Sequence, residues 1–201
     1  MENRFRYRTV AMILALGSLA GMAESLKTRE AGRIILVKVL NTAGAPLEML
    51  QGAEQQMAQV YRRFGATVVW QYTAEVPRGE PSLGAAEGYA VYYLRILRRE
   101  GAYRKELDPR AAGYAAPGSR FVSVFYDRIQ DEAAVMDVPE HVIFGYVVAH
   151  ELGHTFLPAN CHAPGSVMSA HMEKEYWNKA RKGWLNFRPE DGKQILAALR
   201  R

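Results

Sequence analysis

A strand, a helix and a second strand follow one another directly within residues 33–71, and this succession strongly constrains the fold. Residues 33–40 (RIILVKVL) and 66–71 (ATVVWQ) are apolar and rich in β-branched side chains, which is typical of buried strands. Between them, apolar residues recur at steps of three and four over residues 46–63, and Gly65 follows where a helix C-terminal glycine is expected. Because a helical crossover joins the two strands, we predict that they pair in parallel.

The rest of the chain extends this pattern into one α/β domain over residues 24–201. We predict further strands over 89–97, 113–116 and 120–126, a helix over 139–156 that Pro158 ends, and a final helix that begins near Pro189. The short, small-sided strand at 113–116 suits the edge of a sheet. Residues 77–88 are turn-rich and residues 98–110 are polar, so we assign both to loops.

Composition excludes several other classes of protein. The 201 residues are 49% hydrophobic and 23% charged, which allows a single domain of ordinary size with a real core. Disordered and collagen-like chains have different compositions. The single cysteine, Cys161, cannot form an intramolecular disulfide or build a zinc site of three or four cysteines.

Residues 1–23 have the three parts of a secretory signal peptide. Three arginines and one glutamate lie in the first eight residues, an apolar run covers residues 9–20, and small residues follow at Gly21 and Ala23. The apolar stretch of about 15 residues is shorter than the roughly 20 that a membrane-spanning helix needs, which disfavours a retained anchor. We therefore predict cleavage after Ala23, with Ala20 as the alternative. The mature protein would be secreted or periplasmic, without a stable membrane span.

The charge balance does not indicate a nucleic-acid partner. The chain has 26 basic and 21 acidic side chains, and residues 1–23 contribute three arginines and one glutamate to that excess. The 23 basic and 20 acidic side chains that follow are a weak excess for a phosphate-binding surface. We predict no nucleic-acid partner.

The sequence HELGH at residues 150–154 lies inside the predicted helix 139–156 and matches the H-E-x-x-H pattern of zinc hydrolases. Residues four apart in a helix share one face, so His150 and His154 can bind one ion. Glu151 can then accept a proton from a zinc-bound water, whose pKa falls to about 7. Two unrelated histidines on a solvated helix are the alternative, but apolar residues flank the motif, and buried imidazoles without partners cost free energy.

A catalytic zinc site needs a third protein ligand, and several downstream residues qualify. His162 lies eight residues after His154, and a sharp turn beyond Pro158 would bring it back to the metal. The competitors are Cys161, His171, Glu173 and Glu175, the last two on a possible helix over 170–180. We favour His162, which predicts one zinc ion per chain.

The stretch HELGHTFLPANCHAPGSVMS at residues 150–169 resembles the metzincin zinc peptidases, and within them the small bacterial archaemetzincin-like members. Metzincins share the motif H-E-x-x-H-x-x-G-x-x-H and a turn that places a methionine beneath the metal. Met168, 14 residues after His154, resembles that methionine. The chain departs from the motif at Leu157, which stands at the glycine position, and at Asn160, which stands where the third histidine falls. His162 comes two residues later.

The resemblance implies a metzincin-like fold with a twisted, mostly parallel sheet and a short antiparallel edge strand. A backing helix, an active-site helix and a C-terminal helix would complete it. The resemblance further implies that His150, His154 and His162 bind zinc, that Glu151 is the general base, and that the substrate is a protein or peptide. Archaemetzincins use several cysteines for a second zinc, which Cys161 alone cannot provide.

These observations predict an exported zinc-dependent metalloendopeptidase. Three alternatives stay open: a cell-wall amidase with the same helix motif, a thermolysin-like enzyme with Glu173 as third ligand, and a non-catalytic zinc-binding domain. Glu151 has no role in a closed structural zinc site, so its presence favours catalysis. No tyrosine stands two residues after Met168, where some metzincins place an oxyanion-stabilising group, and His171 and Tyr176 are the candidates for that role.

Overall fold

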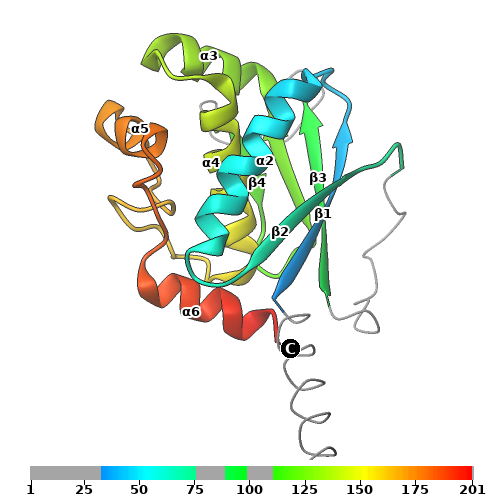
Figure 1. The fold of residues 1–201 in the computed structure, drawn as a ribbon, viewed down its shortest axis with the longest axis vertical. Helices are drawn as coiled ribbons and strands as arrows, with labels where there is room; N and C mark the ends of the chain where they lie inside the picture. Colours follow the sequence, from blue (N-terminus) through cyan, green and yellow to red (C-terminus); the bar gives the residue numbers. More distant parts are fainter. Residues whose placement is uncertain (1–32, 76–88, 99–110, 201) are drawn as a thin grey trace, which may run out of the picture.

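The computed structural model describes residues 33–75, 89–98 and 111–200, which form a five-stranded sheet covered by helices (Figure 1). The strands are β1 (Ile34–Asn41), β2 (Thr67–Tyr72), β3 (Tyr89–Leu97), β4 (Gly113–Ala115) and β5 (Phe121–Phe125). The helices are α2 (Leu47–Arg62), α3 (Tyr126–Met136), α4 (Glu140–Phe156), α5 (Lys174–Arg181) and α6 (Pro189–Ala198). The predicted signal peptide, the predicted loop 77–88 and most of the predicted loop 98–110 lie outside the described residues.

The strands follow the order β2-β1-β3-β5-β4 in the sheet. Strand β1 pairs in parallel with both β2 and β3, and β3 pairs in parallel with β5. The short strand β4 runs antiparallel to β5 at the edge. The predicted fold class, a mostly parallel α/β sheet with a short antiparallel edge strand, is therefore confirmed.

One face of the sheet carries the hydrophobic core. In β1, Ile35, Val37 and Val39 are buried, while the residues between them are partly exposed. Helices α2 and α4 pack against each other over the sheet (Figure 1). Their close approach requires Gly145 in α4, because a Cβ there would lie 2.7 Å from the carbonyl oxygen of Ala53 in α2. Helix α4 is consequently buried on most of its surface.

The ends of the two long helices follow from local sequence. Helix α2 is followed by Gly65 in the left-handed region, with φ of 89°. Helix α4 ends at Phe156, because the next residue, Leu157, has the extended conformation (φ of −99° and ψ of 159°) that the following Pro158 favours. Both helices match the segments predicted for them.

The structure also contains a helix that the sequence patterns did not predict. Helix α3 occupies Tyr126–Met136, between β5 and α4; we had assigned Tyr126 to the end of a strand and no element to residues 127–136. Only Tyr126 and Ile129 of this helix are buried, so its apolar periodicity is weak. Helix α5 (Lys174–Arg181) overlaps the possible helix over 170–180, begins one residue after Glu173 and ends one residue beyond that segment.

Candidate metal centre

Helix α4 presents His150 and His154 on one face, one turn apart. The two rings lie at an interplanar angle of 80° with centroids 4.6 Å apart, and their Nε2 atoms are separated by 2.9 Å. Behind the first histidine, the buried Tyr61 of α2 donates a hydrogen bond to the carbonyl oxygen of Ala149 at 3.1 Å. The backing helix therefore holds the backbone that carries His150.

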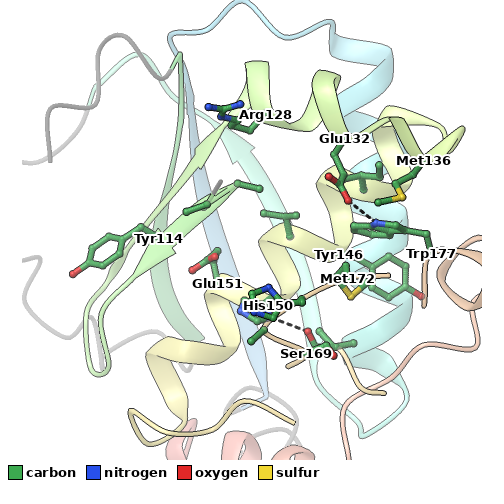
Figure 2. Close-up of a pocket in the computed structure, with 18 of the residues that line it drawn as sticks. Tyr114, Arg128, Glu132, Met136, Tyr146, His150, Glu151, Ser169, Met172 and Trp177 are labelled. Carbon is green, nitrogen blue, oxygen red and sulfur yellow. Dashed lines mark hydrogen bonds between the residues drawn. The ribbon is translucent and has the colours of Figure 1, made fainter. Parts of the chain in front are cut away.

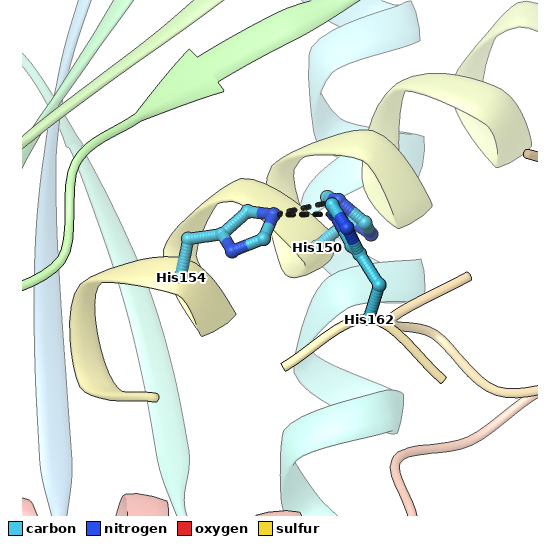
Figure 3. Close-up of side chains that lie close together, drawn as sticks. All are labelled: His150, His154 and His162. Carbon is cyan, nitrogen blue, oxygen red and sulfur yellow. Dashed lines mark hydrogen bonds between the residues drawn. The ribbon is translucent and has the colours of Figure 1, made fainter. Parts of the chain in front are cut away.

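His162 reaches the same point from the chain beyond α4 (Figure 3). The loop that carries it is closed by a hydrogen bond from the amide of Ala163 to the carbonyl oxygen of Met168, at 2.8 Å. The Nε2 atom of His162 lies 3.2 Å from that of His154, and one ligand nitrogen from each of the three rings falls within 4.8 Å of the others. The structure thus brings together the three residues named as metal ligands. Because His162 is exposed, the centre is open to solvent.

The Nε2 atom of His154 lies at distances from the other two Nε2 atoms that are close to those a zinc ion requires. In a tetrahedral site with Zn–N distances of about 2.0–2.1 Å, two ligand nitrogens lie about 3.3–3.4 Å apart. The Nε2 separations of 2.9 and 3.2 Å are close to that value. The Nδ1 atom of His150 lies 2.8 Å from the carbonyl oxygen of Val167, which can only accept, so Nδ1 carries the proton and the lone pair of Nε2 is available to a metal.

The other candidates for the third ligand lie elsewhere. The sulfur of Cys161 is 3.3 Å from Nδ1 of His154, the ring nitrogen that does not face the other two histidines. Glu173 is exposed at the start of α5, and His171 lines the cleft without joining the cluster. Within residues 33–75, 89–98 and 111–200, the three histidines are the one group of three or more potential ligands that converges.

A turn after His162 passes beneath the site and carries Met168. This methionine is fully buried, and a Cβ on Gly153 would lie 2.7 Å from its sulfur, so Met168 packs directly on α4 beside the metal centre. The hydroxyl of Ser166 accepts a hydrogen bond from the amide of Met168 at 3.1 Å and stabilises the turn. The same turn supplies the Val167 carbonyl that orients His150.

Glu151 is buried against the edge strand β4. Burial raises the pKa of its carboxyl to about 8, and a hydrogen bond from the backbone N–H of Ala115 opposes this shift. A Cβ at Gly113 would lie 2.7 Å from Cγ of Glu151, so the strand passes directly against the side chain. The edge strand therefore fixes the carboxylate beside His150.

A cleft of about 600 Å³ opens over these residues (Figure 2). One part is lined by the three histidines, Glu151 and β4. The other part lies between α3, α4 and α5, where Glu132 and Trp177 meet. The cleft thus has two parts: a polar part that contains the possible metal ligands, and a second part farther along α4.

No protein-family model matches the sequence, and no curated protein matches it. Among solved structures, a zinc-dependent peptidase from Methanocorpusculum labreanum matches with a TM-score of 0.52 and 15% sequence identity, over 80% of this chain and 99% of that chain. Archaemetzincin from Methanopyrus kandleri matches with a TM-score of 0.54 and 19% identity, over 85% of this chain and 97% of that chain. This chain has the archaemetzincin fold.

The third histidine of this chain comes two residues later than the third histidine of the metzincin motif. Leu157 occupies the position where the family motif has glycine, and it is buried. The chain then continues through Pro158 and Asn160 before His162 turns back to the cluster. The two additional residues lengthen the loop without removing the third histidine from the site.

The far wall of the cleft was missed by sequence reasoning. Arg128, Glu132 and Met136 line it from α3, which was not predicted, and Trp177 lines it from α5. The sequence signal for α3 was the spacing of Tyr126, Ile129 and Met136 by three and seven residues. This spacing is helical, but it involves only a few apolar residues. Of the two candidates for oxyanion stabilisation, His171 lines the cleft and Tyr176 does not.

Stability of the metal-free protein should reach a maximum near pH 6.5. Burial and nearby imidazoles lower the pKa values of His150 and His154 from 6.5 to about 4. Between pH 4 and 6.5 the unfolded chain therefore binds more protons at these sites, and stability rises with pH. Glu151 has the opposite effect and lowers stability as pH rises. Its carboxyl has a pKa of about 8 in the folded state, so the folded protein keeps a proton that the unfolded chain loses above pH 4.5. Two histidines outweigh one carboxyl below pH 6.5, and Glu151 outweighs the declining contribution of the two histidines above it.

Urea denaturation of chelator-treated protein between pH 4.5 and 8.5 measures this dependence. Between pH 6.5 and 8 we expect a loss of about 0.5 kcal/mol for each pH unit. The variant Glu151→Gln should lose this decline and keep the acid limb. A free energy of unfolding that is constant from pH 6.5 to 8 in the original protein would contradict the assignment to Glu151.

Proposed function

We propose that this protein is a zinc-dependent peptidase. The observation that carries the proposal is the convergence of His150, His154 and His162 beside a buried carboxylate, in an open cleft. The fold supports it, because the two matching structures are described as a zinc-dependent peptidase and archaemetzincin. The three histidines would hold one zinc ion per chain through their Nε2 atoms.

In this proposal Glu151 is the group that moves protons. Zinc bound at the three histidines would supply a Lewis acid that lowers the pKa of water to about 7 and polarises the substrate carbonyl. The Glu151 carboxylate takes one proton from the water as its oxygen adds to the carbonyl carbon. It then gives that proton to the amine nitrogen as the C–N bond breaks, so one peptide bond and one water become an acid and an amine.

The surroundings of Glu151 suit this transfer. The amide of Ala115 and the close contact with Gly113 hold the carboxylate in one place. Burial makes the carboxylate a stronger base than an exposed glutamate, since its pKa lies well above 4.5. A positively charged ion beside it would favour the ionised form that must accept the proton.

We further propose that the peptide binds along β4. This strand is the last in the sheet order, so its outer edge is not paired with another described strand. An extended peptide can add to such an edge through main-chain hydrogen bonds. Because Ala115 and Gly113 contact Glu151, a peptide on β4 would pass close to the proposed base.

We propose export as the setting of this activity. The support is the arrangement of basic, apolar and small residues over 1–23. Among the described residues, no helix has the length and apolar character needed to cross a membrane. The N-terminal sequence of the mature protein tests this proposal.

Hydrolysis of quenched fluorogenic peptides tests the enzymatic proposal. We expect cleavage that falls below about 5% of its starting rate after a chelator removes the metal, and that returns when one equivalent of zinc is added. Cleavage that persists in the chelator would exclude a metal-dependent mechanism. A protein that binds one zinc and cleaves no peptide of a diverse library would favour the non-catalytic alternative.

A further inference from the structure

The second part of the cleft is an apolar channel with a carboxylate. Its apolar lining comes from Val135 and Met136 of α3, Ile143 and Val147 of α4, and Met172 and Trp177 near and in α5. Val147 lies three residues before His150, so this channel begins within one helical turn of the metal centre. A substrate side chain next to the cleaved bond can therefore extend into it.

Glu132 is the polar side chain that distinguishes this part of the cleft (Figure 2). Its Oε1 atom accepts a hydrogen bond from the indole N–H of the buried Trp177 at 2.9 Å. Among the described residues, no basic side chain lies within 4.0 Å of its carboxylate. Within the part of the chain that the structure describes, its negative charge is therefore not neutralised by an ion pair.

The other charges of the cleft do not compensate Glu132. Arg128 lines the same cleft from α3, and its guanidinium lies 3.2 Å from the carboxylate of Asp131. That pair is neutral together, which leaves Glu132 as the net charge of this wall. The remaining titratable groups that line the cleft are the metal-centre residues, Tyr114, Tyr146 and the exposed His171.

We propose that this channel binds a lysine or arginine side chain of the substrate, and that Glu132 selects it; this inference rests on the proposed peptidase function. The aliphatic part of a basic side chain would pack on the apolar walls, and its charged end would reach the carboxylate. Such a charge-assisted hydrogen bond is stronger than a neutral one, especially where water is partly excluded. An acidic side chain would meet a like charge.

The structural role of Glu132 can be separated from its proposed role in specificity. A buried indole N–H needs an acceptor, and a glutamine amide oxygen can replace the carboxylate in that bond. The variant Glu132→Gln therefore keeps the contact with Trp177 and removes only the charge. The matched control is Glu175→Gln, which removes an exposed carboxylate of α5 that pairs with Lys179 and does not line the cleft.

Binding of labelled peptides to the Glu151→Gln protein, measured by fluorescence anisotropy, tests the proposal without turnover. The peptides differ only at one residue, which is lysine, norleucine or glutamate. We expect lysine to bind about tenfold more tightly than norleucine, and glutamate more weakly than norleucine. Adding Glu132→Gln should reduce the advantage of lysine to about twofold or less, while adding Glu175→Gln should preserve it.

Cleavage of the same peptides by the protein with Glu151 intact separates the two proposals. Cleavage without a preference for lysine, or a preference that Glu132→Gln leaves unchanged, would overturn the role of Glu132 and leave the peptidase function standing. Selective binding of the lysine peptide without any cleavage would support the channel and contradict the peptidase function. Equal binding of lysine and norleucine would overturn the proposed specificity.

Discussion

Replacing Glu151 with glutamine should lower kcat/KM for peptide hydrolysis by about a thousandfold while the zinc content stays at about one per chain. Glutamine has nearly the same shape, and its amide oxygen can still accept the hydrogen bond from Ala115. It cannot take a proton from water or return it to the leaving amine. The variant therefore removes proton transfer and keeps the three histidines. Steady-state kinetics and metal analysis on the same preparation measure both effects.

The control for this variant is Glu140→Gln, which lies on the same helix. Glu140 is in the first turn of α4, where it accepts a hydrogen bond from Tyr126 at 2.7 Å, and it does not line the cleft. We expect its activity to stay within about twofold of the unmodified protein. If Glu151→Gln kept more than about a tenth of the original activity with zinc bound, Glu151 would not be the principal base.

The second large effect concerns the third ligand. We expect His162→Ala to lower the zinc content from about one per chain to below about 0.2 after dialysis against a chelating resin. Only the two imidazoles of α4 would then bind the ion, because the third ligand, from the chain beyond α4, would be missing. Because His162 is exposed, its replacement should not unfold the protein. Mass spectrometry of the metal and circular dichroism of the same sample measure these two quantities.

Two matched variants decide between His162 and its competitors. His171→Ala removes another exposed histidine of the cleft, and Glu173→Gln removes the acid that a thermolysin-like site would use. Both should retain about one zinc per chain, because neither side chain belongs to the converging group. Zinc retained in His162→Ala and lost in Glu173→Gln would favour the thermolysin-like arrangement instead.

Elements with strong local signals were predicted well. The parallel pairing of β1 and β2 follows from the helix that joins them, and the ends of α2 and α4 follow from Gly65 and Pro158. Helix α3 was missed because it covers the core with few side chains. Its place in the structure depends on what packs against it, such as the hydrogen bond between Tyr126 and Glu140 of α4.

The metal centre shows the same division between local and distant contacts. His150, Glu151 and His154 share one helix, and helical geometry alone places two imidazoles and a carboxylate close together. The spacing of the histidines could therefore be interpreted without a structure. His162 required a choice among several residues, because the path of the chain after Pro158 is not determined by any short-range rule.

Contacts between distant segments needed the folded chain. The Val167 carbonyl orients His150 from 17 residues away, and Trp177 meets Glu132 across 45 residues. The amide of Ala115 reaches Glu151 only because β4 lies against α4 at the sheet edge. Local patterns in a sequence report backbone periodicity and turn preferences, whereas these contacts depend on how separate elements pack. The helix motif is thus a property of the sequence, and the depth, charge and boundaries of the cleft are properties of the packed structure.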